Sequence, residues 1–487
     1  MLNQQLYQEI DQKLDNYYSN KEKNQWRNNF HIEMPFGLIN DPNGLSYYDN
    51  KFHIFYQWNP FGCEHKTKHW GLVTTTDFIN FTRPKIMLKP KDWFDKNGCY
   101  SGSALVKNDE LKLYYTGNVR GFKGERESYQ CVAIYHKDGI VEKQGVIIKK
   151  QPPGYTAHFR DPYIFIKDNL YYMILGAQTE NLNGKALIYK SKDALKWDLL
   201  GELKTAMESF GYMWECPNMI ELNEDKDVFI FSPQGLESEE FKYQNIYQSG
   251  YIVGTLDLEK VELKNHSEFK ELDMGFDFYA PQVFKHNGKN IMLGWAGLPD
   301  RDYDYPSSEY GWMYSLTVPR VLEYRDNILY QKPLDEIKSL RELQNINLKN
   351  FTCDTYKLNL NNRCTEIILN LEVSQVKHTK IKFMFGEEHI LLTYDKEAKE
   401  CVIDRNNMNL GGRGIRKFKL KAEKELKLHI FIDASIMEIY FQDGLEVTTL
   451  MYFPRKEGLE LQIENDNKEV NLKQLSMWKL RSVCYEG

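Results

Sequence analysis

The pattern of apolar and polar residues along this chain repeats in five hairpin-like units. In each unit an apolar run leads into a polar turn and a second apolar run follows, as in "LSYYDNKFHIFYQ" and "YIFIKDNLYYMILGAQ". Runs of this kind, bounded by turn residues, are typical of antiparallel β-strands. The other three units are "ALVKNDELKLYYTG", "NMIELNEDKDVFIFSPQG" and "QVFKHNGKNIMLGWAG", and the turn asparagines are Asn50, Asn108, Asn169, Asn223 and Asn287.

Successive turn asparagines are 54 to 64 residues apart, which leaves enough chain for two further strands between hairpins. Segments such as "HWGLVTTTDFINFTR" and "KALIYKSKDALKWDLL" have the pattern expected of those strands. Four strands per unit and five units predict an all-β domain, a five-bladed β-propeller, over residues 30–330. A large irregular β-domain is the alternative.

The pattern changes after about residue 335. Stretches such as "EIILNLEV" and "LKLHIFID" alternate apolar and polar residues with period two, which is typical of half-buried strands. We therefore expect a C-terminal β-sandwich over residues 345–487, joined to the propeller by a linker at 326–348. Its expected role is structural, and a carbohydrate-binding or homodimer-forming role is the alternative.

The first 29 residues predict a helical extension, because Leu6, Ile10 and Leu14 recur at helical spacing. The stretch "MLNQQLYQEIDQKLDNYYSN" lacks the basic start, apolar core and small-residue cleavage site of a secretory signal. No apolar run approaches the roughly 20 residues that a membrane span requires. We therefore expect a cytoplasmic location and no membrane partner.

Composition agrees with a globular β-rich protein and excludes several classes of function. Of 487 residues, 42% are hydrophobic and 14% aromatic, with 32 Tyr and 26 Phe, residues that favour strands. The formal net charge of −6 gives no electrostatic reason to expect nucleic-acid binding. The eight cysteines form no CxxC pair, so we expect reduced thiols rather than a disulfide framework or a zinc knuckle.

A short motif with a polar or acidic residue precedes each of the five hairpins. These residues are Asp41 in "NDPNG", Ser101 in "YSGS", Asp161 in "FRDPY", Glu215 in "WECPN" and Tyr279 in "FYAPQ". A lone Asp-Pro is most often a turn. In a propeller, however, the entrances of the innermost strands converge on one mouth, so the pattern predicts three carboxylates in a single site.

Three clustered carboxylates suit glycoside hydrolysis, in which one carboxylate attacks the anomeric carbon and a carboxylic acid protonates the leaving oxygen. Glu215, flanked by a tryptophan and a cysteine, has the least polar setting and is expected to be the general acid/base. Asp41, on a rigid Pro-Asn-Gly turn, is expected to be an ionised nucleophile. Asp161 follows Arg160, whose charge is expected to keep it deprotonated as a transition-state stabiliser.

The same acids are not expected to hold a metal ion. The chain has no calcium-loop spacing such as DxDxDG. Cys63, His65 and His69 are close in sequence but lack a fourth ligand nearby. We therefore predict neither a metal site nor a cofactor.

The motifs "NDPNG", "FYQ", "YSGS", "FRDP", "WECP" and "YAPQ", in this order, resemble those of glycoside hydrolase family 32, the invertases and β-fructosidases. The resemblance spans roughly residues 30 to 480. It implies a five-bladed propeller followed by a β-sandwich, retaining hydrolysis of terminal β-fructofuranosides, and the three acidic roles assigned above. The substrate-binding residues that it implies are Asn40, Gln57, Tyr100, Ser101, Arg160, Trp214, Tyr279 and Trp295.

Several of these positions have a structural alternative, since Trp295 and Tyr100 could pack between blades and Gln57 could end a strand. The chain also departs from the family. Leu38-Ile39 replaces the usual tryptophan before Asn-Asp, and His65 replaces an aromatic residue after "FYQ". Both departures are expected to alter the apolar wall around the sugar substrate.

The loops "NPFGCEHKTKHWG" and "YTGNVR" most resemble those of family members that hydrolyse sucrose 6-phosphate. Lys66, Lys68 and Arg120 are the expected phosphate contacts. The alternatives are a cytoplasmic β-fructosidase acting on sucrose or short fructo-oligosaccharides, an inverting arabinan-type hydrolase, and a lectin-like sugar binder without catalysis.

Overall fold

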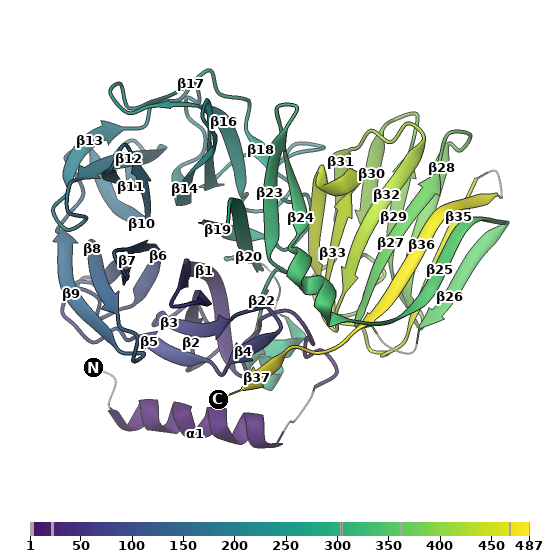
Figure 1. Ribbon diagram of the computed structural model, residues 1–487, viewed down its shortest axis with the longest axis horizontal. Coiled ribbons are helices and arrows are strands. Elements are labelled where there is room, and N and C mark those ends of the chain that lie inside the picture. Colours follow the sequence, from purple (N-terminus) through teal and green to yellow (C-terminus); the bar gives the residue numbers. More distant parts are fainter. Residues whose placement is uncertain are drawn as a thin grey trace.

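The chain folds into two β-rich bodies, a ring of sheets and a stack of two sheets beside it (Figure 1). The structure is a computed structural model that describes residues 4–20, 24–301, 303, 305–360, 363–466 and 469–486. The fold is all-β, a β-propeller followed by a β-sandwich, and this part of the sequence prediction is confirmed. None of the described helices is both long and apolar enough to cross a membrane.

The ring begins with three sheets that follow one another along the chain. The first sheet contains β1 (Gly37–Tyr48), β2 (Lys51–Asn59), β3 (His69–Thr75), β4 (Asn80–Thr82) and β5 (Lys85–Leu88), joined by β21 (Trp312–Met313) and β37 (Cys484–Glu486). The second contains β6 (Cys99–Lys107), β7 (Glu110–Arg120), β8 (Arg126–Tyr135) and β9 (Val141–Ile148). The third contains β10 (Tyr155–Lys167), β11 (Leu170–Thr179), β12 (Gly184–Ser191) and β13 (Asp198–Glu202).

Two more sheets complete the ring. One contains β14 (Met213–Asn223), β15 (Lys226–Gln234), β16 (Gly250–Asp257), β17 (Glu262–Lys264) and β18 (Lys270–Glu271). The other contains β19 (Tyr279–His286), β20 (Lys289–Ala296), β22 (Ser315–Leu316), β23 (Arg320–Arg325) and β24 (Ile328–Pro333). The first strands of the sheets contact one another in the cyclic order β1, β6, β10, β14, β19 and back to β1, so they surround a common axis.

The hairpins that open these sheets turn where the sequence pattern places them. Four of the turns contain a pair of residues at positive φ, as at Asp49-Asn50 and Asn287-Gly288. Two successive left-handed residues make the type I′ turn, whose twist matches that of paired strands. Asparagine, aspartate and glycine tolerate this conformation best, which explains why asparagine marks these turns.

The second body is a sandwich of two antiparallel sheets. One sheet has the order β25 (Arg341–Cys353), β36 (Val470–Leu480), β27 (Thr365–Glu372), β32 (Glu425–Ile432), β33 (Ile436–Phe441) and β34 (Glu446–Met451). The other has the order β26 (Thr355–Leu360), β35 (Leu459–Asn465), β28 (His378–Phe385), β29 (Glu388–Asp395), β30 (Glu400–Asp404) and β31 (Ile415–Lys419). Alternate residues of both sheets, such as Ile381 and Leu428, form one buried core between them. Short 3-10 helices are η1 (Pro306–Tyr310), η2 (Asp335–Leu340) and η3 (Gln442–Gly444).

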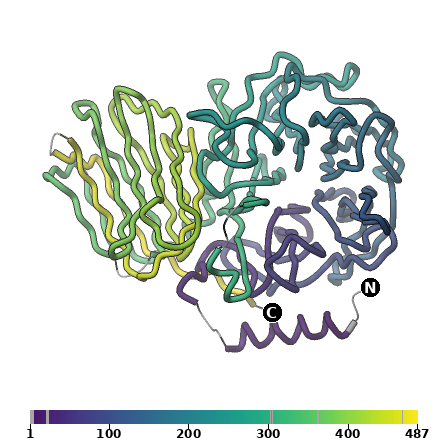
Figure 2. The backbone as a smooth tube through the Cα atoms, turned by 180° about the vertical axis from the view of Figure 1, so that it is seen from behind, coloured from purple at the N-terminus to yellow at the C-terminus, as the bar shows by residue number. Residues whose placement is uncertain are grey.

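Both ends of the described chain lie against the first sheet of the propeller (Figure 2). Helix α1 (Gln4–Asn20) buries Ile10 and Leu14 in a core that includes Phe36, as its amphipathic pattern predicts. Strand β37 pairs in parallel with β4. The last described residues of the chain therefore pack on the propeller. The segment 326–348, expected to be a linker, contains β24 and the start of β25.

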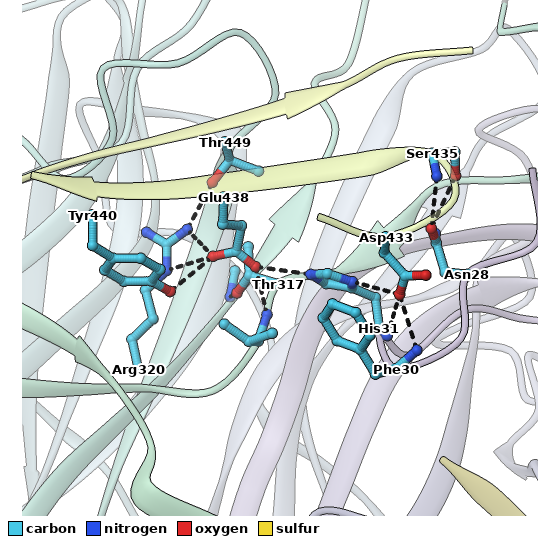
Figure 3. A network of polar contacts seen from close by, with 12 residues as sticks. Asn28, Phe30, His31, Thr317, Arg320, Asp433, Ser435, Glu438, Tyr440 and Thr449 are labelled. Atoms are coloured by element: carbon cyan, nitrogen blue, oxygen red, sulfur yellow. Dashed lines mark hydrogen bonds and ion pairs between the residues drawn. The ribbon is translucent and has the colours of Figure 1, made fainter. Parts of the chain in front are cut away.

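A buried polar network joins the sandwich to the propeller (Figure 3). Arg320 on β23 donates to Glu438 on β33 at 2.7 Å, and both side chains are fully buried. The ring of His31, from the segment that follows α1, contacts two acids of the sandwich, with Nδ1 3.0 Å from Asp433 and Nε2 3.1 Å from Glu438. Buried charges that are paired and hydrogen-bonded in this way fix one relative position of the parts that carry them.

Candidate active site

Each strand nearest the propeller axis bulges where its predicted site residue lies. The pairing register shifts at Ile39/Pro42 in β1, Tyr100/Gly102 in β6, Arg160/Tyr163 in β10, Glu215/Asn218 in β14 and Tyr279/Gln282 in β19. A bulge leaves a residue unpaired and changes the direction of its side chain. Proline follows in four of these motifs, and because it has no N–H it suits a position without a ladder hydrogen bond.

Three bulges also hold a non-glycine residue in the left-handed region. These are Asp161 at φ 65°, Cys216 at φ 45° and Ala280 at φ 47°, each directly before a proline. Such a conformation costs energy for residues with a Cβ and persists only where the surrounding structure enforces it. The bulges therefore give the residues around the axis a fixed geometry.

The three predicted carboxylates meet around Cys216. Its backbone N–H donates to Asp161 Oδ2 at 3.0 Å, and its thiol lies 3.7 Å from the same oxygen and 3.8 Å from Asp41 Oδ2. Glu215 precedes this cysteine and acts electrostatically on both aspartates. Residues more than fifty positions apart in the chain are thus brought together, as the radial arrangement predicts.

A chain of hydrogen bonds holds the carboxylate of Asp41. Its oxygens accept from Ser101 Oγ and from Asn40 Nδ2, the latter at 3.0 Å. Gln57 links these two donors, because its amide donates to Ser101 Oγ at 2.8 Å and accepts from Asn40 at 2.6 Å. The ammonium of Lys68 completes the chain at 2.5 Å from Asn40 Oδ1. This arrangement orients Asp41 toward the shared site.

Glu215 has a more polar setting than its neighbours in the sequence suggest. Arg160 donates to Glu215 Oε1 from Nε at 3.0 Å and from Nη2 at 2.6 Å. Gln234 Nε2 and the Tyr279 hydroxyl donate to the other oxygen at 2.8 and 2.6 Å. The expectation that Glu215 has the least polar setting of the three acids was wrong, because the alternation of the strand places the flanking Trp214 on the opposite face.

The pKa values of both aspartates are raised rather than lowered. Burial raises the pKa of Asp41, although the hydrogen bonds from Ser101 and Asn40 oppose the change. Burial also raises the pKa of Asp161 to about 7, against the lowering effect of Arg160. The sequence expectation of two low pKa values is therefore wrong for the site without substrate, because desolvation outweighs the neighbouring donors.

Three other predicted substrate-binding residues, Tyr100, Trp295 and His65, lie beside residues of the site. Tyr100 lies half-buried next to Ser101, and Trp295 packs 6.2 Å from the ring of Tyr279. The exposed ring of His65 lies 5.4 Å from Trp295, so it borders the same region.

Three of the predicted residues do not reach the site. Leu38 and Ile39 are fully buried in the core of the propeller. The indole of Trp214 packs 4.5 Å from the ring of Phe231 and donates to Phe210 O at 2.6 Å. The prediction that these three side chains contact substrate is corrected accordingly, because their strands direct them into the interior.

The three predicted phosphate contacts also lie in different environments. Lys66 is exposed and pairs with its neighbour Glu64. Lys68 is buried against Asn40, and burial lowers its pKa to about 7. Arg120 is exposed at the end of β7. Two of the three predicted cations, Lys66 and Arg120, are therefore exposed, whereas Lys68 is buried.

Sequence reasoning missed Gln234, His158 and Arg126. Gln234 lies at the far end of the hairpin that carries Glu215, and the register of that hairpin was the only signal. His158 lies two residues before Arg160 on the same face of β10 and accepts a hydrogen bond from Arg160 Nη1 at 2.9 Å. In the described part of the chain, no group of three or more His, Cys, Asp or Glu side chains is arranged to hold a metal ion.

Comparisons with known proteins agree with the motifs. The family model of the glycosyl hydrolases family 32 N-terminal domain matches residues 31–333, and that of the family 32 C terminal matches residues 336–479. A sucrose-6-phosphate hydrolase of Bacillus subtilis is 41% identical over 440 residues, 88% of this chain and 89% of that protein. One of Staphylococcus xylosus is 35% identical and covers 96% of each chain. The solved structure of sucrose-6-phosphate hydrolase from Lactobacillus gasseri superposes with a TM-score of 0.85 and 31% identity, covering 97% of each chain.

Proposed function

This chain belongs to glycosyl hydrolases family 32, and from that membership we propose that it is a retaining β-fructofuranosidase that hydrolyses sucrose 6-phosphate to glucose 6-phosphate and fructose. The relatives that support this substrate are named as sucrose-6-phosphate hydrolases and align over most of the chain. The observation that carries the reaction type is the meeting of Asp41, Asp161 and Glu215 around Cys216.

In the first step, the carboxylate of Asp41 attacks the anomeric carbon of the fructosyl group. Glu215 gives its proton to the glycosidic oxygen, so the glucosyl part leaves as an alcohol and a covalent fructosyl-enzyme forms. In the second step, Glu215 takes a proton from water, and the resulting hydroxide releases fructose from Asp41. Both steps together consume one water molecule and restore the enzyme.

Neighbouring residues place these groups for the reaction. Ser101 and Asn40 fix the direction of the Asp41 carboxylate, while Arg160, Gln234 and Tyr279 hold both oxygens of Glu215. Asp161 is proposed to bind fructosyl hydroxyls and to stabilise the positive charge that develops in the ring. Such preorganised groups need not reorganise when charge develops in the transition state.

A substrate panel tests the proposal. We expect kcat/KM for sucrose 6-phosphate to exceed that for sucrose, and NMR to detect the β-anomer of fructose as the first product. Equal values for the two substrates would favour the second candidate, a β-fructosidase acting on sucrose or short fructo-oligosaccharides. The α-anomer as first product would indicate inversion, for which the two carboxyl groups lie about 6.5–9.5 Å apart rather than about 5 Å.

The finer architecture belongs to the same proposal. We take the sheets that begin with β1, β6, β10, β14 and β19 as five blades of a propeller over residues 30–330, preceded by an extension at 1–29 and followed by a sandwich at 345–487. The cyclic contacts among the five first strands support this count. A phosphorylated sugar as substrate fits a cytoplasmic location.

A further inference from the structure

Two arginines face each other at the turn end of the β7–β8 hairpin, on either side of the 121–125 connection. Arg120 and Arg126 are direct partners in the antiparallel register, so their side chains project from the same face of the sheet. Neither has a carboxylate within ion-pair distance among the residues that the structure describes. Like charges at directly opposite positions destabilise a strand pair unless a counter-charge lies between them. The hairpin end therefore lacks an anion that would offset this repulsion.

Arg126 reaches from this hairpin toward the site. Its guanidinium lies 5.7 Å from the ring centroid of Tyr100, the residue before Ser101. Its one hydrogen bond within the described protein is a long contact of 3.4 Å from Nη1 to Asn118 Oδ1, and its Nε is buried without a partner. Most of the five donors of this side chain are therefore left for a ligand.

His158 lies within the electrostatic influence of this arginine pair and contacts Arg160, which binds Glu215. Arg160 can only donate hydrogen bonds, so His158 Nδ1 is the acceptor in their 2.9 Å contact and the ring proton lies on Nε2. Burial and the charges of Arg160 and Arg126 lower the pKa of His158 to about 4, which keeps this neutral tautomer at neutral pH. Since Arg160 also binds Glu215, a polar path leads from the general acid to His158, on which both Arg126 and Arg120 act electrostatically.

We propose that Arg126, together with Arg120 and the Nε2–H of His158, forms the site that holds the 6-phosphate of the substrate's glucosyl group. The inference rests on the proposed function and assigns residues to one part of its substrate. Glu215 protonates the glycosidic oxygen, so the glucosyl group must leave from its side of the site, where Arg160 and His158 lie.

The chemistry of the ligand matches that of the site. A phosphate monoester carries a charge of about −1.5 to −2 at pH 7 and three acceptor oxygens. The planar guanidinium of an arginine binds such a group through two parallel hydrogen bonds, which a lysine cannot reproduce. Two arginines and one neutral donor would neutralise the dianion and relieve the repulsion between the arginines.

The test compares Arg126→Gln and Arg126→Lys with the unaltered enzyme on two substrates. We expect Arg126→Gln to lower the ratio of kcat/KM for sucrose 6-phosphate to that for sucrose by about 10- to 100-fold, the value of one or two charge-assisted hydrogen bonds. Arg126→Lys should lower this ratio less, because lysine retains the positive charge but not the two parallel donors of the guanidinium. Inhibition by glucose 6-phosphate should weaken in parallel, whereas inhibition by glucose should not.

Arg325→Gln is the matched control, because Arg325 is an exposed arginine on β23 that lies over the ring of Tyr330. It should leave the substrate ratio unchanged. If Arg126→Gln lowered kcat/KM equally for both substrates, the proposal would be overturned, because the residue would then have a general structural role. A variant whose kcat/KM values both stayed unchanged would overturn it as well. If the unaltered enzyme has the higher kcat/KM for sucrose, the proposed substrate is wrong, and the phosphate site that depends on it is wrong too.

Discussion

Lys68 places a buried cation beside the proposed nucleophile. Its ammonium is 2.5 Å from Asn40 Oδ1, and Asn40 in turn donates to Asp41. The positive charge of Lys68 lowers the pKa of Asp41, against the larger opposite effect of burial. Burial lowers the pKa of Lys68 itself to about 7, so it carries its charge in the acidic range where Asp41 must ionise.

We therefore predict that Lys68→Met moves the acidic limb of the kcat/KM profile for sucrose to higher pH. Without the ammonium, the carboxylate of Asp41 is less favoured and its pKa rises, so more enzyme is in the inactive protonated form at low pH. Lys66→Met is the control, because Lys66 is exposed and pairs with Glu64. Superimposable acidic limbs for Lys68→Met and the unaltered enzyme would contradict the role given to Lys68.

A better leaving group can replace the proton that Glu215 supplies, but it cannot replace the nucleophile Asp41. We predict that Glu215→Gln lowers kcat for sucrose by about 10²- to 10⁴-fold, the usual contribution of a general acid. A fructoside with a good leaving group needs no protonation, so Glu215→Gln should regain its first step on such a substrate. Asp41→Asn should stay inactive on both, because it lacks the nucleophile.

The measurement is the rate of leaving-group release in the first turnover. Glu224→Gln supplies the matched control, since Glu224 is an exposed acid in the turn of the same hairpin. Unchanged hydrolysis of sucrose by Glu215→Gln would remove this residue from the role of general acid.

At the scale of the element, the β-bulges at the entrances of the inner strands position the site. Sequence patterns predicted the hairpins because apolar runs and asparagine turns are local signals. They also placed Asp41, Asp161 and Glu215 in register around one axis. The direction of a side chain next to a bulge depends on a local register shift that no residue pattern specifies. Trp214 lies before the bulge, where regular alternation places it on the face opposite Glu215.

Contacts between distant elements were equally inaccessible to sequence reasoning. Strand β37 has three residues, and its pairing with β4 depends on where the sandwich returns the chain. Arg126 lies outside the acidic motifs in the sequence, and it comes near Tyr100 and β10 only because the strands of one sheet pack against those of the next. The motifs of single strands are therefore visible in the sequence, whereas residues supplied by neighbouring strands are not.

Ala280 tests whether the bulge geometry is required. It is buried at φ 47° directly after Tyr279, whose hydroxyl holds Glu215. Ala280→Val should reduce the free energy of unfolding by about 1–3 kcal/mol, because a β-branched residue is strained at positive φ. Displacement of Tyr279 should lower kcat as well. Ala280→Gly, which adopts this φ without strain, should retain activity, and urea unfolding with steady-state kinetics measures both effects.

At the scale of the whole molecule, the polar network in Figure 3 joins the sandwich to the propeller and to the segment after α1. Burial would lower the pKa of His31, but its hydrogen bonds to Asp433 and Glu438 outweigh this and raise the pKa to about 9. The charge of Arg320 and the contact with His31 lower the pKa of Glu438 to about 2, although burial opposes them. The network is therefore a set of paired charges at neutral pH.

These shifts set the pH range in which the network stabilises the protein. The folded pKa of His31 lies above its ordinary value of 6.5, so its contribution is complete below pH 6.5 and is lost as the pH rises through about 9. The folded pKa of Glu438 lies below its ordinary value of 4.5, so its contribution is complete above pH 4.5 and is lost toward pH 2. The interface should therefore be most stable between pH 4.5 and 6.5.

We predict that His31→Gln lowers the free energy of unfolding by about 3–5 kcal/mol near pH 6, the cost of removing one partner from a buried charge network. Above pH 9 the difference from the unaltered protein should shrink, because the native histidine has then lost its proton. Thermal unfolding across pH 6 to 10 measures both values. His136→Gln is the control, since His136 faces Glu142 on the surface and such exposed pairs contribute little. A difference that stays constant across this range would show that His31 stabilises the interface by packing and not by its charge.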